Sequence, residues 1–277
     1  MSAFFIGQLL FFREQNQLIW PIEAFDLCKN RVGSTPSQTS QPPPAPNPSP
    51  LKISIIIPVI NEAEQIKTSV EKAWNAGADE VLVVDGGSTD GTREGIDGVN
   101  CEFIESLPGR AVQMNKGAAA ATGDILVFLH ADNWLTPGCC EQLRTALAGS
   151  EGGFGGFRQQ ITNDQRIFRW IESGNGLRLK WQGLIYGDQA MFIERKLFDA
   201  VGGFPEMELM EDFEFSRMMC RHGKPLLLEG PTIVSARRWE KTGPIRQTVT
   251  NWVLSFSYRL GASPKWIASR YRRHDQN

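Results

Sequence analysis

The chain has 277 residues, in which 29 Lys and Arg face 31 Asp and Glu for a formal net charge of −2. This balance argues against a dedicated nucleic-acid binder, which is usually basic. No apolar run reaches the roughly 18 residues that a membrane-spanning helix needs. With 41% apolar and 22% charged residues, the composition is that of a soluble globular protein.

The five cysteines have neither C-x-x-C spacing nor the density of a disulfide framework. We therefore expect reduced thiols in a cytoplasmic protein. They are Cys28, Cys101, Cys139, Cys140 and Cys220.

Residues 1–50 differ in composition from the rest of the chain. An apolar run from Phe4 to Phe12 has no basic residues ahead of it and no small-residue cleavage site behind it, so a secretory signal is not predicted. Between Pro36 and Pro50, seven of fifteen residues are proline, and such a segment cannot build a core. We interpret 1–50 as a poorly ordered extension or a start codon placed too far upstream. A small hydrophobic anchor is the alternative.

Short apolar runs and amphipathic stretches alternate from Lys52 onward. The β-branched run Ile53 to Ile60 predicts a buried parallel strand. A helix follows, with Asn61 as its expected cap and Glu64 three residues later, and Gly77 ends it. Val81 to Val84 then predicts a second strand, which completes a βαβ unit.

The alternation continues and predicts an open α/β half-domain over 52–132. Its further elements are a strand at Cys101 to Glu105, a helix at Arg110 to Ala121 and a strand at Ile125 to Leu129. The second half is less regular, so we expect a mixed central sheet with helices on both faces over 51–240. Its predicted elements are a helix from Pro137 to Leu147, a glycine-rich strand near Phe154 to Ile161, and helices near Ile167 to Leu179 and Met210 to His222.

Polar residues follow three of the predicted strands, at Asn61-Glu62, at Asp85 to Thr92 and at His130 to Asn133. In an open α/β sheet ligands bind beyond the carboxyl ends of the strands, so these loops should face one crevice. The Asp85 loop has three glycines in seven residues, which allow close backbone approach to a nucleotide. A tight turn with Asp as its cap has the same composition, and both interpretations stay open.

Asp132 follows a hydrophobic strand, where a carboxylate can share a divalent cation with diphosphate oxygens. Alternatively, Asp132 forms a turn and caps the helix near Pro137. Arg110 stands at a helix start, where the macrodipole disfavours a cation, and a contact with phosphate or base would explain its position.

Several motifs together resemble the inverting family 2 glycosyltransferases of the GT-A fold. They are Ile57-Pro58 with Asn61-Glu62, Val84-Asp85-Gly86-Gly87-Ser88, Gly123-Asp124, and Glu211-Asp212. A fuller set resembles the compact subgroup of arsenosugar-biosynthesis, or radical-SAM and selenodomain-associated, glycosyltransferases. That set is Gly109-Arg110, Phe128 to Asp132, Gly187-Asp188-Gln189, Met210-Glu211-Asp212 and Arg237-Arg238-Trp239.

The resemblance implies a GT-A (Rossmann-like) nucleotide-diphospho-sugar transferase fold and a role for each matching residue. Asp85 would contact the base, Arg110 the base or diphosphate, Asp132 a Mn or Mg ion, and Asp212 would be the catalytic base. The family's metal motif is usually Asp-x-Asp, and His130 replaces its first Asp here. Its neutral imidazole offers one donor and one acceptor, so the ribose contact would differ. Further substrate contacts are implied for Pro58, Glu62, Asp188, Gln189, Glu211, Arg238 and Trp239.

Three of these positions also have simpler interpretations. Asp188 and Gln189 either line the acceptor side or belong to a structural turn. Glu211 either belongs to the acidic pair of the family or is a first-turn acid of a helix, where the dipole favours it. Arg238 and Trp239 resemble an Arg-Trp element that holds diphosphate or stacks on a sugar ring.

The tail after Trp239 has apolar residues at helical spacing from Ile245 to Leu260, which predicts an amphipathic helix over part of 241–277. From Arg237 to Asn277, nine Lys or Arg face two acids. A basic helix of this kind can lie on an anionic membrane, cover the catalytic domain or pair two subunits, and these three interpretations remain open.

The leading hypothesis is a metal-assisted, inverting transfer of a sugar from a nucleoside-diphosphate sugar, with a UDP-sugar favoured, to an unidentified acceptor hydroxyl. One alternative is a nucleotidyltransferase, although its glycine-rich loop would normally follow the first strand directly. The other is a nucleotide-sugar-binding module that has lost catalysis, against which Asp212 and Asp132 argue.

Overall fold

The computed structural model describes residues 50–149 and 152–275. The fold is that of the second of two units of the chain, Pro48–Asn277. The expectations for Phe4 to Phe12, for Cys28 and for the proline-rich segment up to Ser49 fall outside the described residues.

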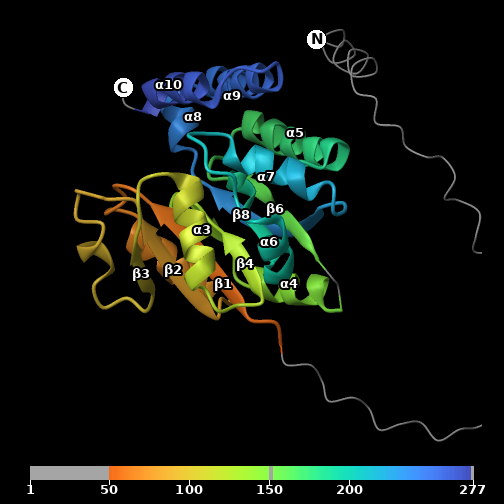
Figure 1. Cartoon of the computed structure of the whole chain (residues 1–277). Coiled ribbons are helices and arrows are strands. Elements are labelled where there is room, and N and C mark those ends of the chain that lie inside the picture. The colour runs from red at the N-terminus through yellow and green to blue at the C-terminus, as the bar shows by residue number, and fades with distance from the viewer. Residues whose placement is uncertain (1–49, 150–151, 276–277) are drawn as a thin grey trace, which may run out of the picture. The chain divides into compact units, whose positions relative to one another are not determined.

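Within the described residues, the second unit is built on one eight-stranded sheet in the order β3-β2-β1-β4-β7-β6-β8-β5 (Figure 1). The first half, β3 to β4 in that order, is parallel. β7 then runs antiparallel to both β4 and β6, β8 runs parallel to β6, and β5 is antiparallel to β8. The predicted mixed sheet is therefore confirmed. Its strands are β1 (Ile53–Val59), β2 (Glu80–Asp85), β3 (Glu102–Glu105), β4 (Ile125–Phe128), β5 (Asn133–Leu135), β6 (Phe154–Ile161), β7 (Met191–Glu194) and β8 (Leu226–Val234).

Helices cover both faces of the sheet, and the alternation of side chains along β1 shows why. Ile55 and Ile57 point into a core shared with helices α2 and α4, whereas Ile56 points into a core shared with α3, α6 and α7. All three isoleucines are fully buried. The helices are α2 (Ile66–Asn75), α3 (Arg110–Ala120), α4 (Cys139–Leu147), α5 (Arg166–Gln182), α6 (Arg195–Val201), α7 (Glu211–Met219), α8 (Arg237–Thr242), α9 (Pro244–Arg259) and α10 (Pro264–Asp275), with 3-10 turns η2 (Glu94–Ile96) and η3 (Gly187–Gln189).

The predicted cap of the first helix is wrong. Helix α2 begins at Ile66, and Asn61 lies in the left-handed region with φ of 55°. The Asn61 side chain instead accepts a hydrogen bond from the backbone N–H of Thr89 at 2.9 Å. An Asx residue satisfies a loop as readily as a helix start, and the composition of the segment does not distinguish the two uses.

The predicted helix in the tail is confirmed as α9, whereas β5, β7, β8, α6, α8 and α10 had no counterpart in the predicted elements. β8 is only partly buried along most of its length and contains Pro231, so it lacks the continuous apolar run of a central strand. β5 is only three residues long. The interpretation of Asp132 as a helix cap is also wrong, because β5 intervenes and Gly138 is the N-cap of α4.

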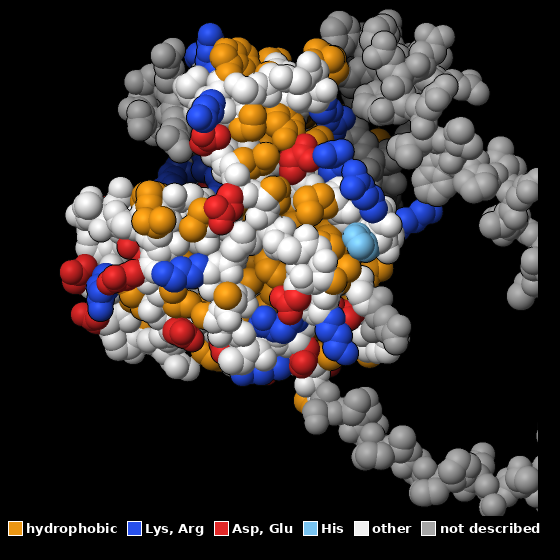
Figure 2. All heavy atoms as spheres, viewed as in Figure 1, with side chains coloured by type: hydrophobic (Ala, Val, Ile, Leu, Met, Phe, Trp, Pro, Cys, Tyr) orange, Lys and Arg blue, Asp and Glu red, His pale blue; other side chains and the backbone are white. Residues whose placement is uncertain are grey.

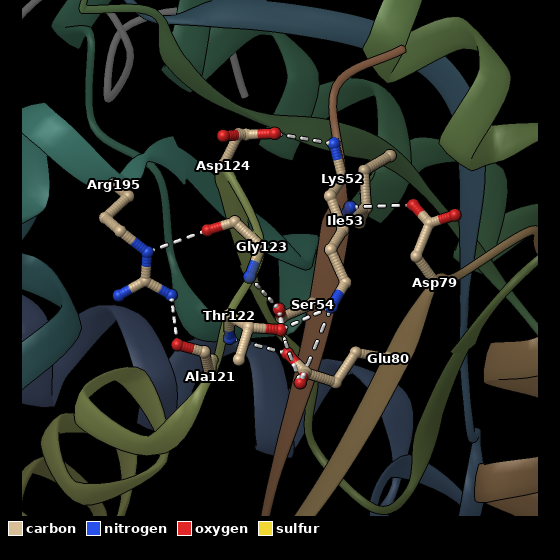
Figure 3. A network of polar contacts seen from close by, with 10 residues as sticks. All are labelled: Lys52, Ile53, Ser54, Asp79, Glu80, Ala121, Thr122, Gly123, Asp124 and Arg195. Carbon is tan, nitrogen blue, oxygen red and sulfur yellow. Dashed lines mark hydrogen bonds and ion pairs between the residues drawn. The ribbon is translucent and has the colours of Figure 1, made fainter. Parts of the chain in front are cut away.

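A polar network that involves the Gly123-Asp124 motif joins the amino ends of the parallel strands β1 and β4 (Figure 3). The Gly123 N–H donates to Ser54 Oγ at 2.9 Å, and the Lys52 N–H donates to an Asp124 carboxylate oxygen at 2.8 Å. A Cβ on Gly123 would lie 2.7 Å from the Ser54 backbone nitrogen, so this position requires glycine. Arg195 donates to the carbonyls of Ala118, Ala121 and Gly123 at 2.7–3.0 Å. The Gly123-Asp124 motif therefore stabilises the amino ends of the strands, away from the loops that follow their carboxyl ends.

Candidate active site

The strand-end loops after β1 and β2 are joined by side-chain hydrogen bonds. The Asn61 N–H donates to Ser88 Oγ at 2.8 Å, and the Glu62 N–H donates to Thr92 Oγ1 at 2.9 Å. The Ser and Thr hydroxyls of the glycine-rich loop are thus used to hold the first loop in place.

Asp85 organises its own loop. Its buried carboxylate accepts hydrogen bonds from the Gly87 N–H at 3.1 Å, from the Ser88 N–H at 3.0 Å and from the Ser88 hydroxyl. Gly87 has φ of 95°, which favours glycine. These contacts support the turn interpretation, and a contact of Asp85 with a base would use its remaining lone pairs.

Gln113 of α3 ties two strand ends together and is a residue that sequence reasoning missed. Its buried Nε2 donates to the Val59 carbonyl at 2.7 Å and to the Val84 carbonyl at 2.8 Å. A Cβ on Gly86 would lie 3.0 Å from the Gln113 side chain, so the glycine gives this amide its room. A Gln on a helix face carries no signal in the sequence that would reveal this contact.

Gly187 brings His130 and Asp212 together, although they are far apart in sequence. The Gly187 N–H donates to Asp212 Oδ2 at 2.8 Å, and a Cβ on Gly187 would lie 2.4 Å from His130 Nε2. Asp212 Oδ1 accepts a second hydrogen bond from the Phe213 N–H at 2.7 Å. Burial, followed by the charge of Arg110, lowers the pKa of His130 to about 4, so its imidazole is neutral at pH 7.

Arg110 and Glu211 form an ion pair at the start of their helices. Arg110 Nη1 lies 3.2 Å from Glu211 Oε1, and Glu211 is 1% exposed. Burial raises the pKa of Glu211, Arg110 opposes the shift and Asp212 adds to it. The ion pair with Glu211 explains why Arg110 can occupy the first residue of α3, so a phosphate contact is not needed to explain its position. The half-buried Asp212 remains the acid of this pair that solvent can reach.

Five of the predicted site residues line one small cavity beyond the carboxyl ends of β1 and β4. They are Pro58, Arg110, His130, Glu211 and Asp212, joined by Gly187. The sequence separates them into four segments, and the sheet brings them together.

Glu62, Asp132 and Arg238 lie close enough to influence one another electrostatically. Burial and then the Asp132 carboxylate raise the pKa of Glu62, whereas Arg237 and Arg238 lower it. Arg238 also lowers the pKa of His130. The charges of Asp132 and Arg238 therefore act both on Glu62 and on His130, which lines the cavity. No group of three His, Cys, Asp or Glu within the described residues is arranged to hold a metal ion by itself.

Asp188, Gln189 and Trp239 make contacts that belong to a turn, a strand and an apolar cluster of the protein. Gln189 is 1% exposed, and its side chain accepts a hydrogen bond from the Tyr186 N–H at 3.2 Å, which closes turn η3. The Asp188 carbonyl accepts a hydrogen bond from Gln159. Trp239 is 8% exposed and packs perpendicular to Phe168 in a separate apolar cluster, so little of its indole is accessible to a sugar. These contacts support the turn interpretation of Gln189 and do not support a sugar-stacking role for Trp239.

Tyr271 of α10 is a second residue near the site that sequence reasoning missed. The Arg238 guanidinium donates to the Tyr271 hydroxyl, and Arg238 Cζ lies 5.5 Å from the centre of the Tyr271 ring. The hydroxyl of Tyr271 also contributes to the electrostatic surroundings of Arg110. Helical spacing predicts a tail helix but not the surface on which it docks.

The model of the family described as glycosyl transferase family 2 matches residues 54–205. A PGL/p-HBAD biosynthesis glycosyltransferase from Mycobacterium tuberculosis (strain ATCC 25177 / H37Ra) is 30% identical over 230 residues, which cover 75% of this chain and 86% of that protein. Three further curated glycosyltransferases match over only 30–34% of their own length, so the chain spans about a third of those relatives.

Two solved structures have folds similar to that of this chain. Staphylococcus aureus TarS 1-349 in complex with UDP gives a TM-score of 0.54 at 17% identity, over 67% of this chain and 60% of that one. The mannosyltransferase PcManGT from Pyrobaculum calidifontis, in complex with GDP-Man and Mn²⁺, gives 0.51 at 20% identity, over 79% and 67%. The architecture is thus the GT-A fold, as the resemblance implied.

Proposed function

The chain belongs to glycosyl transferase family 2, and on this basis we propose that it transfers a sugar from a nucleoside-diphosphate sugar to an acceptor hydroxyl. The observation that carries the proposal is the cavity beyond β1 and β4, where Asp212 and Arg110 meet His130. It offers a carboxylate that can take a proton beside a guanidinium that can meet phosphate.

Asp212 is the proposed base. Two backbone N–H groups fix the orientation of its carboxylate, and each oxygen keeps a lone pair for the proton of the acceptor. In a single displacement the acceptor oxygen bonds to the anomeric carbon as the bond to the diphosphate breaks, so the configuration inverts. Glu211 is less suited to this role, because it is buried against Arg110.

The diphosphate of the donor would meet Arg110 and Arg238, with Asp85 on the side of the base. TarS is described in complex with UDP and PcManGT with GDP-Man, which supports a nucleotide sugar as the donor. We propose a UDP-sugar, and a hexosyl group as the transferred unit. Membership of the arsenosugar-biosynthesis subgroup rests on the motifs around Arg110, His130, Asp188 and Trp239.

The residues present fit a divalent cation, Mn or Mg, held in part by the donor. Asp132 is a half-buried carboxylate whose charge, after burial, raises the pKa of Glu62, and a cation would relieve this repulsion between the two carboxylates. When bound, the cation supplies neutralisation of the leaving diphosphate. A single protein carboxylate is sufficient where diphosphate oxygens and water complete the coordination.

The test is a screen of UDP- and GDP-sugars by thermal shift, with and without Mn²⁺. The correct donor should stabilise the fold by about 2.7 kcal/mol at a hundredfold excess over Kd. Release of nucleoside diphosphate, followed by NMR of the anomeric configuration of the product, then tests transfer and inversion. Binding without any turnover would favour the inactive binding module, and release of inorganic pyrophosphate from a nucleoside triphosphate would favour a nucleotidyltransferase.

A further inference from the structure

Helix α9 presents a continuous apolar face to solvent. Six large side chains recur at helical spacing and are 48–73% exposed. They are Ile245, Val249, Trp252, Val253, Phe256 and Leu260, and we refer to them as the α9 apolar face. Trp266 of α10 is 44% exposed as well. Figure 2 shows hydrophobic side chains together with Lys and Arg at the end of the molecule where Figure 1 places α9 and α10.

The opposite side of α9 is the one that packs on the protein, and much of it is polar. The Tyr258 hydroxyl donates to Glu214 of α7 at 2.8 Å, and Trp239 Nε1 donates to Thr248 at 3.3 Å. Gln247 and Leu254 are buried. A surface helix of a globular protein usually turns its apolar side inward, so α9 is oriented in the reverse sense. Specific hydrogen bonds hold it in this orientation.

The charged residues of helices α8, α9 and α10 are mostly basic, with nine Lys or Arg against the two acids Glu240 and Asp275. The sequence of α9 contains no Asp or Glu, and exposed basic residues lie along the three C-terminal helices. They are Arg237, Lys241, Arg246, Lys265 and Arg270. Exposed apolar side chains, including two Trp and one Phe, on helices that also carry exposed basic residues match the boundary between acyl chains and anionic headgroups.

We propose that the α9 apolar face docks on a lipid bilayer that carries anionic headgroups. A second copy of this chain is a poorer occupant, because pairing two such faces would bring like charges together. Within the described residues no helix is long and apolar enough to cross a membrane. The helix would therefore lie in the plane of the interface, with its basic side chains reaching toward the headgroups.

Docking would also orient the cavity relative to the bilayer. Tyr258 packs edge-on against Phe213 of α7 at 5.4 Å between ring centres, and Phe213 follows Asp212 directly. One helix thus connects the apolar face with the residue that we propose as base. An acceptor hydroxyl displayed at a membrane surface would be within reach of such a site.

The experiment is co-sedimentation of the full chain with vesicles of phosphatidylcholine alone or with phosphatidylglycerol added. We expect binding to the anionic vesicles that weakens as NaCl is raised, and much weaker binding to the neutral ones. The double variant Trp252→Ser/Phe256→Ser should lower the partition coefficient by at least about tenfold, since it removes two large apolar side chains that would be buried in the bilayer. Both side chains are about half exposed, so the fold should persist, and circular dichroism checks this.

A matched pair of single variants tests whether the face itself is responsible. Leu260 and Leu107 are 73% and 75% exposed, but only Leu260 belongs to the α9 apolar face. Leu260→Ser should weaken binding and Leu107→Ser should not. Equal effects of the two, no binding of the wild type to anionic vesicles, or wild-type binding by the double variant would overturn the proposal. Lipid-free dimers in analytical ultracentrifugation that dissociate in the double variant would assign the face to a second copy instead.

Discussion

Replacing Asp212 with asparagine should separate chemistry from binding. The amide has nearly the shape of the carboxylate but cannot accept the proton of the acceptor hydroxyl. Both carboxylate oxygens accept a backbone N–H, from Gly187 at 2.8 Å and from Phe213 at 2.7 Å. In Asp212→Asn the new NH₂ group must face one of these donors, so one hydrogen bond is lost in either orientation.

The two consequences differ in size. Loss of a general base typically costs about 10² to 10⁴ in rate, which corresponds to about 2.7–5.5 kcal/mol in the activation free energy. Loss of one hydrogen bond, with an N–H left facing a donor, costs about 1–3 kcal/mol of stability. For a domain of this size, each kcal/mol lowers the melting temperature by about 2–4 °C. The variant should therefore stay folded at 25 °C and lose nearly all transfer.

Three measurements resolve these effects. Calorimetry gives the donor affinity, which should stay within about threefold of wild type, since Asp212 is not assigned to donor contacts. Single-turnover transfer gives the chemical step, and thermal unfolding gives the stability. Restoration of the rate at higher pH would not be expected, because the amide does not ionise.

Glu211→Gln is the comparison variant. It leaves the charge of Arg110 without its partner at 3.2 Å, so it should lower stability more than Asp212→Asn does. Its effect on single-turnover transfer should be the smaller of the two. Wild-type transfer in Asp212→Asn with a collapse in Glu211→Gln would move the base by one residue. Wild-type transfer in both would exclude this helix from the reaction.

Three further predictions test the surroundings. In Gly187→Ala the new Cβ would lie 2.4 Å from His130 Nε2, so the imidazole ring must shift. A misplacement of about 1 Å can lower kcat by about 10²-fold. An unchanged kcat would show that the position of the His130 ring does not matter for turnover. Asp132→Asn should weaken donor binding in Mn²⁺ but not in EDTA, as calorimetry would show, and equal affinities in both media for variant and wild type would refute the metal assignment. Burial alone would raise the pKa of the Glu80 carboxyl, but hydrogen bonds from Ser54 and Thr122 outweigh burial and hold this pKa below its ordinary 4.5. The contribution of the Glu80 carboxylate to the free energy of unfolding is therefore complete above pH 4.5 and is lost as the pH falls through the lower folded-state pKa. Urea unfolding should show that the stability deficit of Glu80→Gln relative to wild type shrinks below pH 4.5. A stability deficit that does not change with pH would contradict this.

The sequence by itself determined the parallel half of the sheet. A run such as Ile53 to Ile57 has few stable states other than a strand covered on both faces, and local periodicity is sufficient to read it. The same local signals placed polar residues at the strand ends and predicted helix α9.

Only the tertiary structure decided which of those residues meet. Asp212, His130 and Gly187 lie in three separate segments, and their contact depends on the register of the sheet and on turn η3. The assignment of Asn61 changed for the same reason, since an Asx side chain suits several environments and its neighbours select one. The sequence likewise predicts an amphipathic helix at 245–260 but not which side faces out. That orientation is fixed by the contacts of Tyr258 with Glu214 of α7 and of Thr248 with Trp239 of α8, and such contacts leave no periodic pattern along the chain.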